Sequence, residues 1–145
     1  MTRAIHAFFT MLLCIALDWC WLAVLGNNLL HFQPNAWFDA TDLLFYSLFT
    51  SGILMFSIYP ALYAHDRNIA LYYGAVFGFT AFGLYEVISS LWYIYYPIDL
   101  AVADTIWGVI SGALLGFLSY QLGRWMGMSG SRMKDLALDR GMFLE

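Results

Sequence analysis

Three carboxylates lie inside apolar stretches of the chain that are long enough to cross a bilayer. Asp18, Glu86 and Asp104 are each surrounded by Leu, Phe, Trp, Gly and Ala residues. A charged side chain at the centre of a membrane costs roughly 2.5 to 3.5 kcal/mol on insertion scales, so such residues are functional candidates by default. The sequence places no Lys or Arg at their expected depth. We therefore expect them to bind a proton, to bind a cation, or to pair with another subunit.

The neighbours of each acid on its helix face support a shared site. Residues three and four positions apart lie on one face of a helix, and here they are small, polar or aromatic. Such faces belong in the interior of a bundle, where polar groups satisfy one another or line a wet cavity. The candidate binding residues are Asp18, Glu86, Asp104, Trp21, Trp107 and Ser89.

Simpler interpretations cover part of this set. Asp104 comes near the start of an expected helix, where a carboxylate stabilises the unpaired N–H groups and complements the helix dipole. Trp21 and Trp107 also fit an interfacial belt, because Trp and Tyr concentrate where a membrane meets water. Asp18 lies too deep for a cap, and Glu86 comes close enough to the surface for partial hydration.

Catalytic and metal-binding motifs are not found in the sequence. His6, His31 and His65 come near expected helix ends or loops at both membrane faces, so they cannot share a metal site with the acids. The chain has no glycine-rich phosphate loop and no nucleophile elbow. We expect no enzymatic activity, no cofactor, no metal and no nucleic-acid partner.

The composition is that of a membrane protein. Of the 145 residues, 62% are hydrophobic and 11% are charged, whereas soluble domains have about 25% charged residues. Four apolar runs, each near the ~20 residues that a spanning helix requires, predict an all-α membrane protein with four transmembrane helices in a small bundle. These runs cover residues 4–26, 43–64, 69–91 and 100–123. We expect residues 1–127 to form the transmembrane domain and residues 128–145 to form a cytoplasmic tail.

Positive charges predict the orientation. Arg3 precedes the first run, Arg67 lies between the second and third, and four basic residues follow the fourth, whereas the other two loops contain no Lys or Arg. By the positive-inside rule, both termini and the middle loop are cytoplasmic in a multi-pass inner-membrane protein. At 1.5 Å per residue, all three acids then fall in the outer half of the membrane.

Small residues recur on two of the expected helices. Gly108, Gly112 and Gly116 are spaced by four residues, as are Gly74 and Gly78. Such stripes allow close approach of helix backbones, either within the chain or in a homo-oligomer. Pro60 is expected to kink the second helix.

Several short segments, read in order, carry a resemblance to a known family. They are Leu17-Asp18 with Trp21-Leu22, Leu43-Leu44-Phe45-Tyr46 with Gly52, Phe56 and Pro60-Ala61-Leu62, Gly74-Ala75-Val76-Phe77-Gly78 with Tyr85-Glu86, and Asp104 with Trp107-Gly108. Over roughly residues 10–122, the chain resembles the bacterial predicted-membrane-protein family called domain of unknown function twenty-one seventy-seven. The resemblance implies a small four-helix inner-membrane protein and no particular activity. Where the family usually reads Tyr-Asp-Leu-Thr-Asn, this chain reads Tyr85-Glu86-Val87-Ile88-Ser89.

Two functional hypotheses follow from the sequence. In the first, the acids bind or transport a proton, another small cation or a lipophilic solute, with Asp18 and Glu86 as protonatable residues and Asp104 assisting from the outer side. In the second, the chain is an accessory or assembly subunit whose acids and glycine faces dock against a larger membrane complex. The lipid bilayer is the partner that both hypotheses share, and a homo-oligomer is compatible with either.

Overall fold

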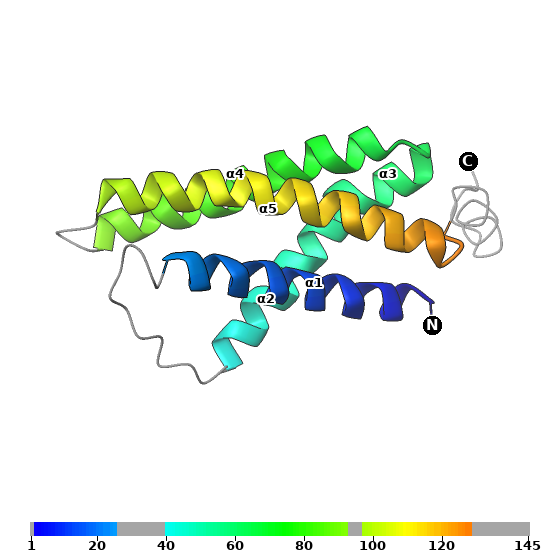
Figure 1. Cartoon of the computed structure of the whole chain (residues 1–145), viewed down its shortest axis with the longest axis horizontal. Helices are drawn as coiled ribbons and strands as arrows, with labels where there is room; N and C mark the ends of the chain where they lie inside the picture. The colour runs from blue at the N-terminus through cyan, green and yellow to red at the C-terminus, as the bar shows by residue number, and fades with distance from the viewer. Residues whose placement is uncertain (1, 26–39, 93–96, 129–145) are drawn as a thin grey trace, which may run out of the picture.

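The structure, a computed structural model, describes residues 2–25, 40–92 and 97–128. Four of its helical segments are long and apolar enough to cross a membrane, and the described residues contain no strand. The predicted all-α fold with four spanning helices is therefore confirmed. Three spans are single helices, α1 (Thr2–Leu25), α4 (Arg67–Trp92) and α5 (Ile98–Trp125), and the remaining one consists of α2 (Ala40–Ile53), η2 (Leu54–Ile58) and α3 (Tyr59–Ala64) (Figure 1).

Large apolar side chains cover the outside of every span. Phe8 on α1, Leu48 on α2, Phe79 on α4 and Leu114 on α5 are 43% to 64% exposed. A soluble protein rarely tolerates so extensive an apolar surface, whereas lipid tails solvate it without cost. The surface of the bundle thus matches a membrane environment.

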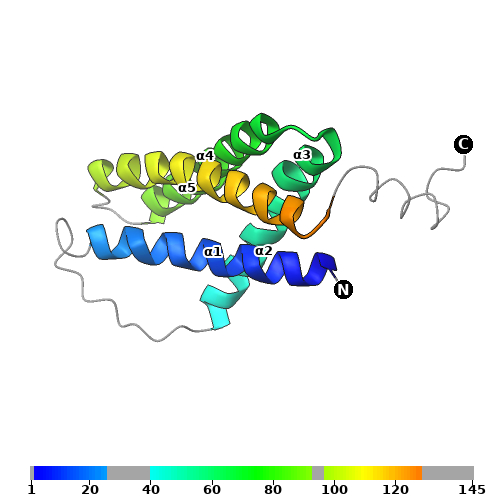
Figure 2. The same cartoon turned by 45° about the vertical axis from the view of Figure 1, so that its right-hand side comes forward.

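The helices form a compact arrangement around α5. In both views α4 and α5 run side by side, α1 lies along α5, and the α2–η2–α3 span crosses the others obliquely (Figures 1 and 2). The glycine stripes explain the closeness of α4 and α5. A Cβ atom added to Gly78 would collide with the carbonyl oxygen of Gly108, and one added to Gly74 would collide with that of Gly112. The two predicted stripes therefore meet each other within the chain.

The middle span is irregular just before Pro60. Its α-helical turns give way to a π-helical segment, η2, and Pro60 then lies in the first turn of α3. Proline has no N–H to donate to the preceding turn, which is a common cause of such helix distortions. Within η2, the fully buried Ser57 donates a hydrogen bond of 2.8 Å to the Ala70 carbonyl oxygen of α4. The distortion thus joins this span to the α4–α5 pair.

One end of the bundle carries all the basic residues of the described ranges. Arg3 begins α1, Arg67 begins α4 and Arg124 ends α5, and these helix ends lie together (Figure 1). The topology prediction requires this clustering, while the membrane side that the cluster faces stays a prediction. The predicted outer loops fall largely on residues 26–39 and 93–96, and most of the predicted tail on 129–145, outside the described residues. Met128, at the start of that tail, is buried against the bundle.

Candidate functional site

Polar side chains line the contact between α1 and α5. The two helices are antiparallel, so successive turns of α1 meet earlier and earlier turns of α5. Thr10 contacts Ser119, and Trp21 contacts Asp104 about three turns later. The acids predicted from the sequence thus meet other polar groups at a helix contact inside the bundle.

Asp104 is held by two tryptophans. The Trp21 indole N–H donates a hydrogen bond of 2.6 Å to Oδ1 of Asp104, from α1 to α5. The Trp21 ring also stacks on the ring of Trp107, with centroids 4.8 Å apart and planes only 1° from parallel. Stacking fixes the donor in front of the carboxylate. These three predicted residues therefore form one cluster.

Asp18 lies next to this cluster, and its neighbours come from α2 and α5. The Tyr46 hydroxyl of α2 donates a hydrogen bond to the Asp18 carboxylate, and the negative charge of Asp104 also acts on it. The Trp107 indole approaches the same carboxylate, but its buried Nε1 does not complete a hydrogen bond. Asp18 on α1 and Asp104 on α5 thus lie in the same part of the α1–α5 contact, and we refer to them as the Asp18–Asp104 pair.

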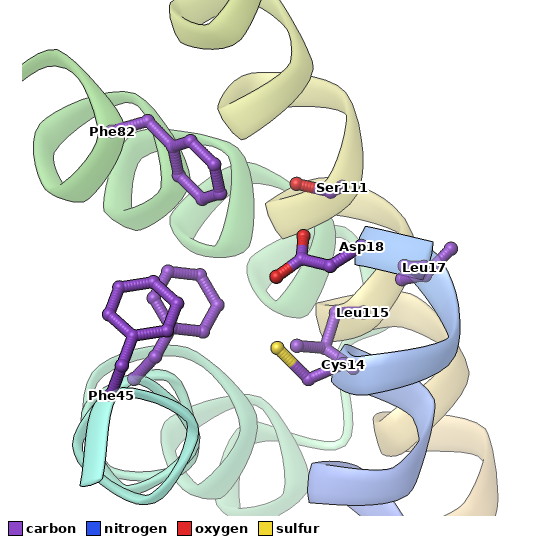
Figure 3. Close-up of a pocket in the computed structure, with 8 residues that line it drawn as sticks. Cys14, Leu17, Asp18, Phe45, Phe82, Ser111 and Leu115 are labelled. Carbon is purple, nitrogen blue, oxygen red and sulfur yellow. The ribbon is translucent and has the colours of Figure 1, made fainter. Parts of the chain in front are cut away.

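A small cavity opens in front of Asp18. Figure 3 shows the Asp18 carboxylate and the Cys14 sulfur pointing from α1 into this space, with Phe45 and Phe82 on the opposite side. Its volume is about 10 Å³, close to the least that one water molecule needs. It is lined by Cys14, Leu17, Asp18, Phe45, Phe49, Phe82, Ser111 and Leu115.

Glu86 and Ser89 lie on the buried side of α4. Glu86 is 4% exposed and Ser89 is 9% exposed. Gly83, one turn earlier on α4, faces Thr105 of α5, because a Cβ atom added to this glycine would lie 3.8 Å from Cγ2 of the threonine. Three further residues of α4 place Glu86 roughly 3 Å beyond the level of Asp104 along the bundle. Glu86 is therefore a neighbour of the carboxylate pair, whose described partners are Trp107, Tyr46 and Trp21.

The simpler interpretations of Asp104, Trp21 and Trp107 can be compared with their places in the structure. Asp99, not Asp104, is the acid in the first turn of α5. Asp104 lies in the second turn, where it accepts the Trp21 hydrogen bond. Trp92 and Trp125 are at least 80% exposed and suit the interfacial belt, whereas Trp21 and Trp107 are half-buried and stack on each other between α1 and α5.

A second polar cluster, which the sequence prediction missed, ties the other end of α1 to α5. His6, Thr10 and Ser119 are fully buried. His6 Nε2 lies 2.8 Å from the Ser119 carbonyl oxygen, and the Thr10 and Ser119 hydroxyls are 2.6 Å apart. His6 lies in the second turn of α1, near a helix end as expected, and the structure adds that its side chain is buried against α5. The four-residue spacing of His6, Thr10 and Cys14 is the sequence signal that could have revealed a polar face.

The His6–Thr10–Ser119 cluster is poorly suited to catalysis or metal binding. Ser119 Oγ lies 3.1 Å from His6 Nε2, but no substrate can reach a serine with no exposed surface. Within the part of the chain that the structure describes, no three His, Cys, Asp or Glu residues are placed to hold a metal ion. These contacts are therefore best explained as links between helices, which in a membrane rely on packing and hydrogen bonds.

Comparison with known protein families gives a match over most of the chain. A family model described as "Predicted membrane protein (DUF2177)" matches residues 4–121. No curated protein and no solved structure matches the chain.

Proposed function

The chain belongs to this family of predicted membrane proteins, and we propose, from the geometry of the site, that it binds a proton at the Asp18–Asp104 pair. The proton would be the coupled ion of a binding or transport cycle within the membrane. The observation that carries the proposal is geometric: Asp18 faces a small cavity one turn before Trp21 on α1, and the Trp21 N–H donates to Asp104 on α5. The location that we propose is the bacterial inner membrane, with both termini in the cytoplasm.

Electrostatics supports proton binding at this pair. Two negative charges repel each other strongly in a medium of low dielectric constant, and two acids at one site commonly share a proton. The arginines of the described ranges lie at the opposite end of the bundle, so they do not neutralise the pair. A proton relieves the repulsion without requiring space.

The size and lining of the cavity favour a proton over larger ligands. About 10 Å³ accommodates at most one water molecule, which excludes a lipophilic solute from this space in the described conformation. A resident metal ion would need more ligands than the two carboxylates provide. We also propose binding rather than enzymatic activity, because within residues 2–25, 40–92 and 97–128 no group of three His, Cys, Asp or Glu residues is placed to hold a metal ion that would activate an electrophile.

The two acids have different surroundings, which suggests different roles. Asp104 accepts a short hydrogen bond from Trp21, which holds its carboxylate in place. Asp18 faces the cavity beside Ser111, where a single water molecule would supply or remove a proton. We assign proton exchange to Asp18 and stabilisation of the charged pair to Asp104.

Infrared difference spectroscopy tests this proposal on the full-length protein in lipid. A pH step that changes the protonation of the pair changes the carbonyl stretching band of protonated carboxylic acids. We expect Asp18→Asn to abolish that band change and Asp104→Asn to reduce or shift it. Asp99→Asn is the matched control, since Asp99 is exposed in the first turn of α5 and contacts neither acid.

The outcomes separate the interpretations. A band change that persists in the Asp18→Asn/Asp104→Asn double variant would show that the pair is not the proton site. Loss of the change only in Glu86→Gln would move the site to Glu86. A stable complex with a larger membrane protein after gentle solubilisation would instead support the accessory-subunit hypothesis.

A further inference from the structure

A polar groove lies at the opposite end of the bundle from the carboxylate pair. It forms where the turn between α3 and α4 meets the last turns of α5, and its volume is about 600 Å³. Arg67 and Asn68 contribute from the start of α4, and Gln121 and Arg124 from the end of α5. Two guanidinium groups from different helices therefore border one groove.

The backbone around the groove is well defined. His65 ends α3 in the left-handed region, with φ of 58°, and the Asp66 N–H donates a hydrogen bond of 3.1 Å to the Ala61 carbonyl oxygen. Asp66 Oδ1 then accepts a hydrogen bond of 2.8 Å from the Asn68 N–H. Tyr120, only 3% exposed, packs beneath the groove. The tight turn thus fixes the position from which Arg67 extends.

The two guanidinium groups are available to a ligand. Among the described residues, neither the Arg67 nor the Arg124 side chain forms an ion pair or a hydrogen bond. Asp66 is the one acid that lines the groove, and its carboxylate is engaged by the start of α4. The groove therefore has an excess of positive charge and several free N–H donors. Guanidinium groups bind phosphate oxygens through pairs of hydrogen bonds, which makes an anionic phosphate the fitting ligand.

The position of the groove along the bundle matches the level of lipid headgroups. Arg67 and Trp125 stand at the limits of two membrane spans. Trp125 is 86% exposed, as is typical of a side chain at the boundary between hydrocarbon and headgroups. Basic pockets between helices at this level bind the headgroups of anionic lipids.

We propose that the groove between the α3–α4 turn and the end of α5 binds the phosphate group of an anionic lipid, with Arg67 and Arg124 as its two cationic ligands. Asn68 and Gln121 supply neutral donors beside them, and the lipid tails extend along the apolar surface. A soluble phosphate compound offers the same chemistry without the tails. The two sources are distinguished by experiment.

Native mass spectrometry of the full-length protein in mild detergent tests the proposal. The protein is titrated with phosphatidylglycerol and, separately, with phosphatidylcholine that has the same acyl chains. We expect a clear preference for phosphatidylglycerol. Each of Arg67→Gln and Arg124→Gln should weaken its binding by about five- to tenfold, the effect of one lost basic contact. Arg3→Gln is the control, because Arg3 carries the same charge at the same end of the bundle but does not line the groove.

A competition arm identifies the source of the phosphate. If glycerol 3-phosphate does not displace phosphatidylglycerol, the ligand is the lipid; if it displaces the lipid at a similar concentration, the groove takes a soluble phosphate. Equal binding of the two lipids by the wild-type protein would overturn the proposal and requires no variant to fold. An equal loss in Arg3→Gln would overturn it too, since binding would then follow net charge alone. Arg67→Lys and Arg124→Lys, which keep the charge but not the paired donors, should retain more binding than the Gln variants.

Discussion

Trp21 connects the two chemical features of the carboxylate site. Its N–H donates to Asp104, and its ring stacks on Trp107, which itself approaches Asp18. A change at Trp21 therefore acts on both acids, on Asp104 directly and on Asp18 through the position of the Trp107 ring. Trp21 thus positions the groups that we propose to exchange the proton.

A double-mutant cycle measures the link between Trp21 and Asp104. Trp21→Phe keeps an aromatic ring but removes the N–H donor, and Asp104→Asn removes the charge of the acceptor. Because hydrogen bonds between membrane helices contribute on average about 0.6 kcal/mol and at most about 1.7 kcal/mol, we expect a coupling energy in that range. The free energy of unfolding in mixed micelles, with increasing denaturing detergent, provides the measurement.

Trp19 offers the matched control for this cycle. It lies two residues away on α1 but is 58% exposed on the outside of the bundle. Trp19→Phe should leave the unfolding free energy nearly unchanged and should show no coupling to Asp104→Asn. Coupling of the same size at Trp19 and Trp21 would contradict the assigned hydrogen bond.

At the scale of the elements, α1 and α4 are attached to α5 in different ways. In the apolar stretch of α1 only 17% of the residues are buried inside the bundle, whereas 39% are buried in the middle span. The link between α1 and α5 therefore depends on the His6–Thr10–Ser119 cluster and the Trp21–Asp104 hydrogen bond. The α4–α5 pair instead depends on backbone contact between glycines. Both are means of helix association where the hydrophobic effect does not act between helices.

The glycine contact gives a sharp prediction for α4. Gly78→Ala places a Cβ atom against the Gly108 carbonyl oxygen, a backbone atom that cannot turn away. We expect the variant to lose about 1–3 kcal/mol of stability or more, as in other overpacked interiors. Thermal unfolding of the purified protein, followed by circular dichroism, measures the loss.

Gly83→Ala is the control on the same helix. Its added Cβ would meet Thr105 Cγ2 at 3.8 Å, an ordinary van der Waals contact. Alanine is favoured over glycine inside a helix by roughly 0.5–1 kcal/mol, so this variant should be neutral or slightly more stable. If Gly78→Ala were equally well tolerated, α4 and α5 would not be in backbone contact at this turn.

At the scale of the whole molecule, the arginines and the carboxylate pair lie toward opposite ends of the bundle. Arg3, Arg67 and Arg124 gather at one end, and the Asp18–Asp104 pair lies toward the other. The positive-inside rule places the arginine end in the cytoplasm. We therefore predict that the carboxylate pair lies nearer the outer surface and that the groove beside Arg67 and Arg124 faces the inner leaflet.

Labelling of single cysteines tests this orientation. Cys14 and Cys20 are first replaced by Ala. A single cysteine is then introduced by Asp99→Cys, at the start of α5, or by Asp66→Cys, in the turn between α3 and α4. A membrane-impermeant thiol reagent added to intact cells should label position 99, and position 66 only after permeabilisation. The reverse pattern would place the arginine cluster on the outside and would invert the depth of the acids.

Much of the fold could be predicted from composition and short-range spacing. The four spans follow from apolar runs, because the cost of placing polar backbone and charge in lipid acts on each segment separately. The stripes at Gly74, Gly78, Gly108 and Gly112 predicted close helix contact, since small residues at intervals of four share one helix face. The spans and their small-residue faces are therefore local properties that the sequence by itself determined.

The tertiary structure alone decided which residues meet. Tyr46 joins Asp18 from another helix, and His6 meets Ser119 across 113 positions of the chain. Likewise, the sequence placed Asp18 and Glu86 first, with Asp104 assisting, whereas only the folded chain shows Asp104 joined to α1 through the Trp21 hydrogen bond. Such contacts depend on how each helix is rotated about its axis, and that rotation is set by packing against neighbours. Hydropathy and spacing within one segment indicate which of its faces is small or polar, but not which residues of another helix that face meets.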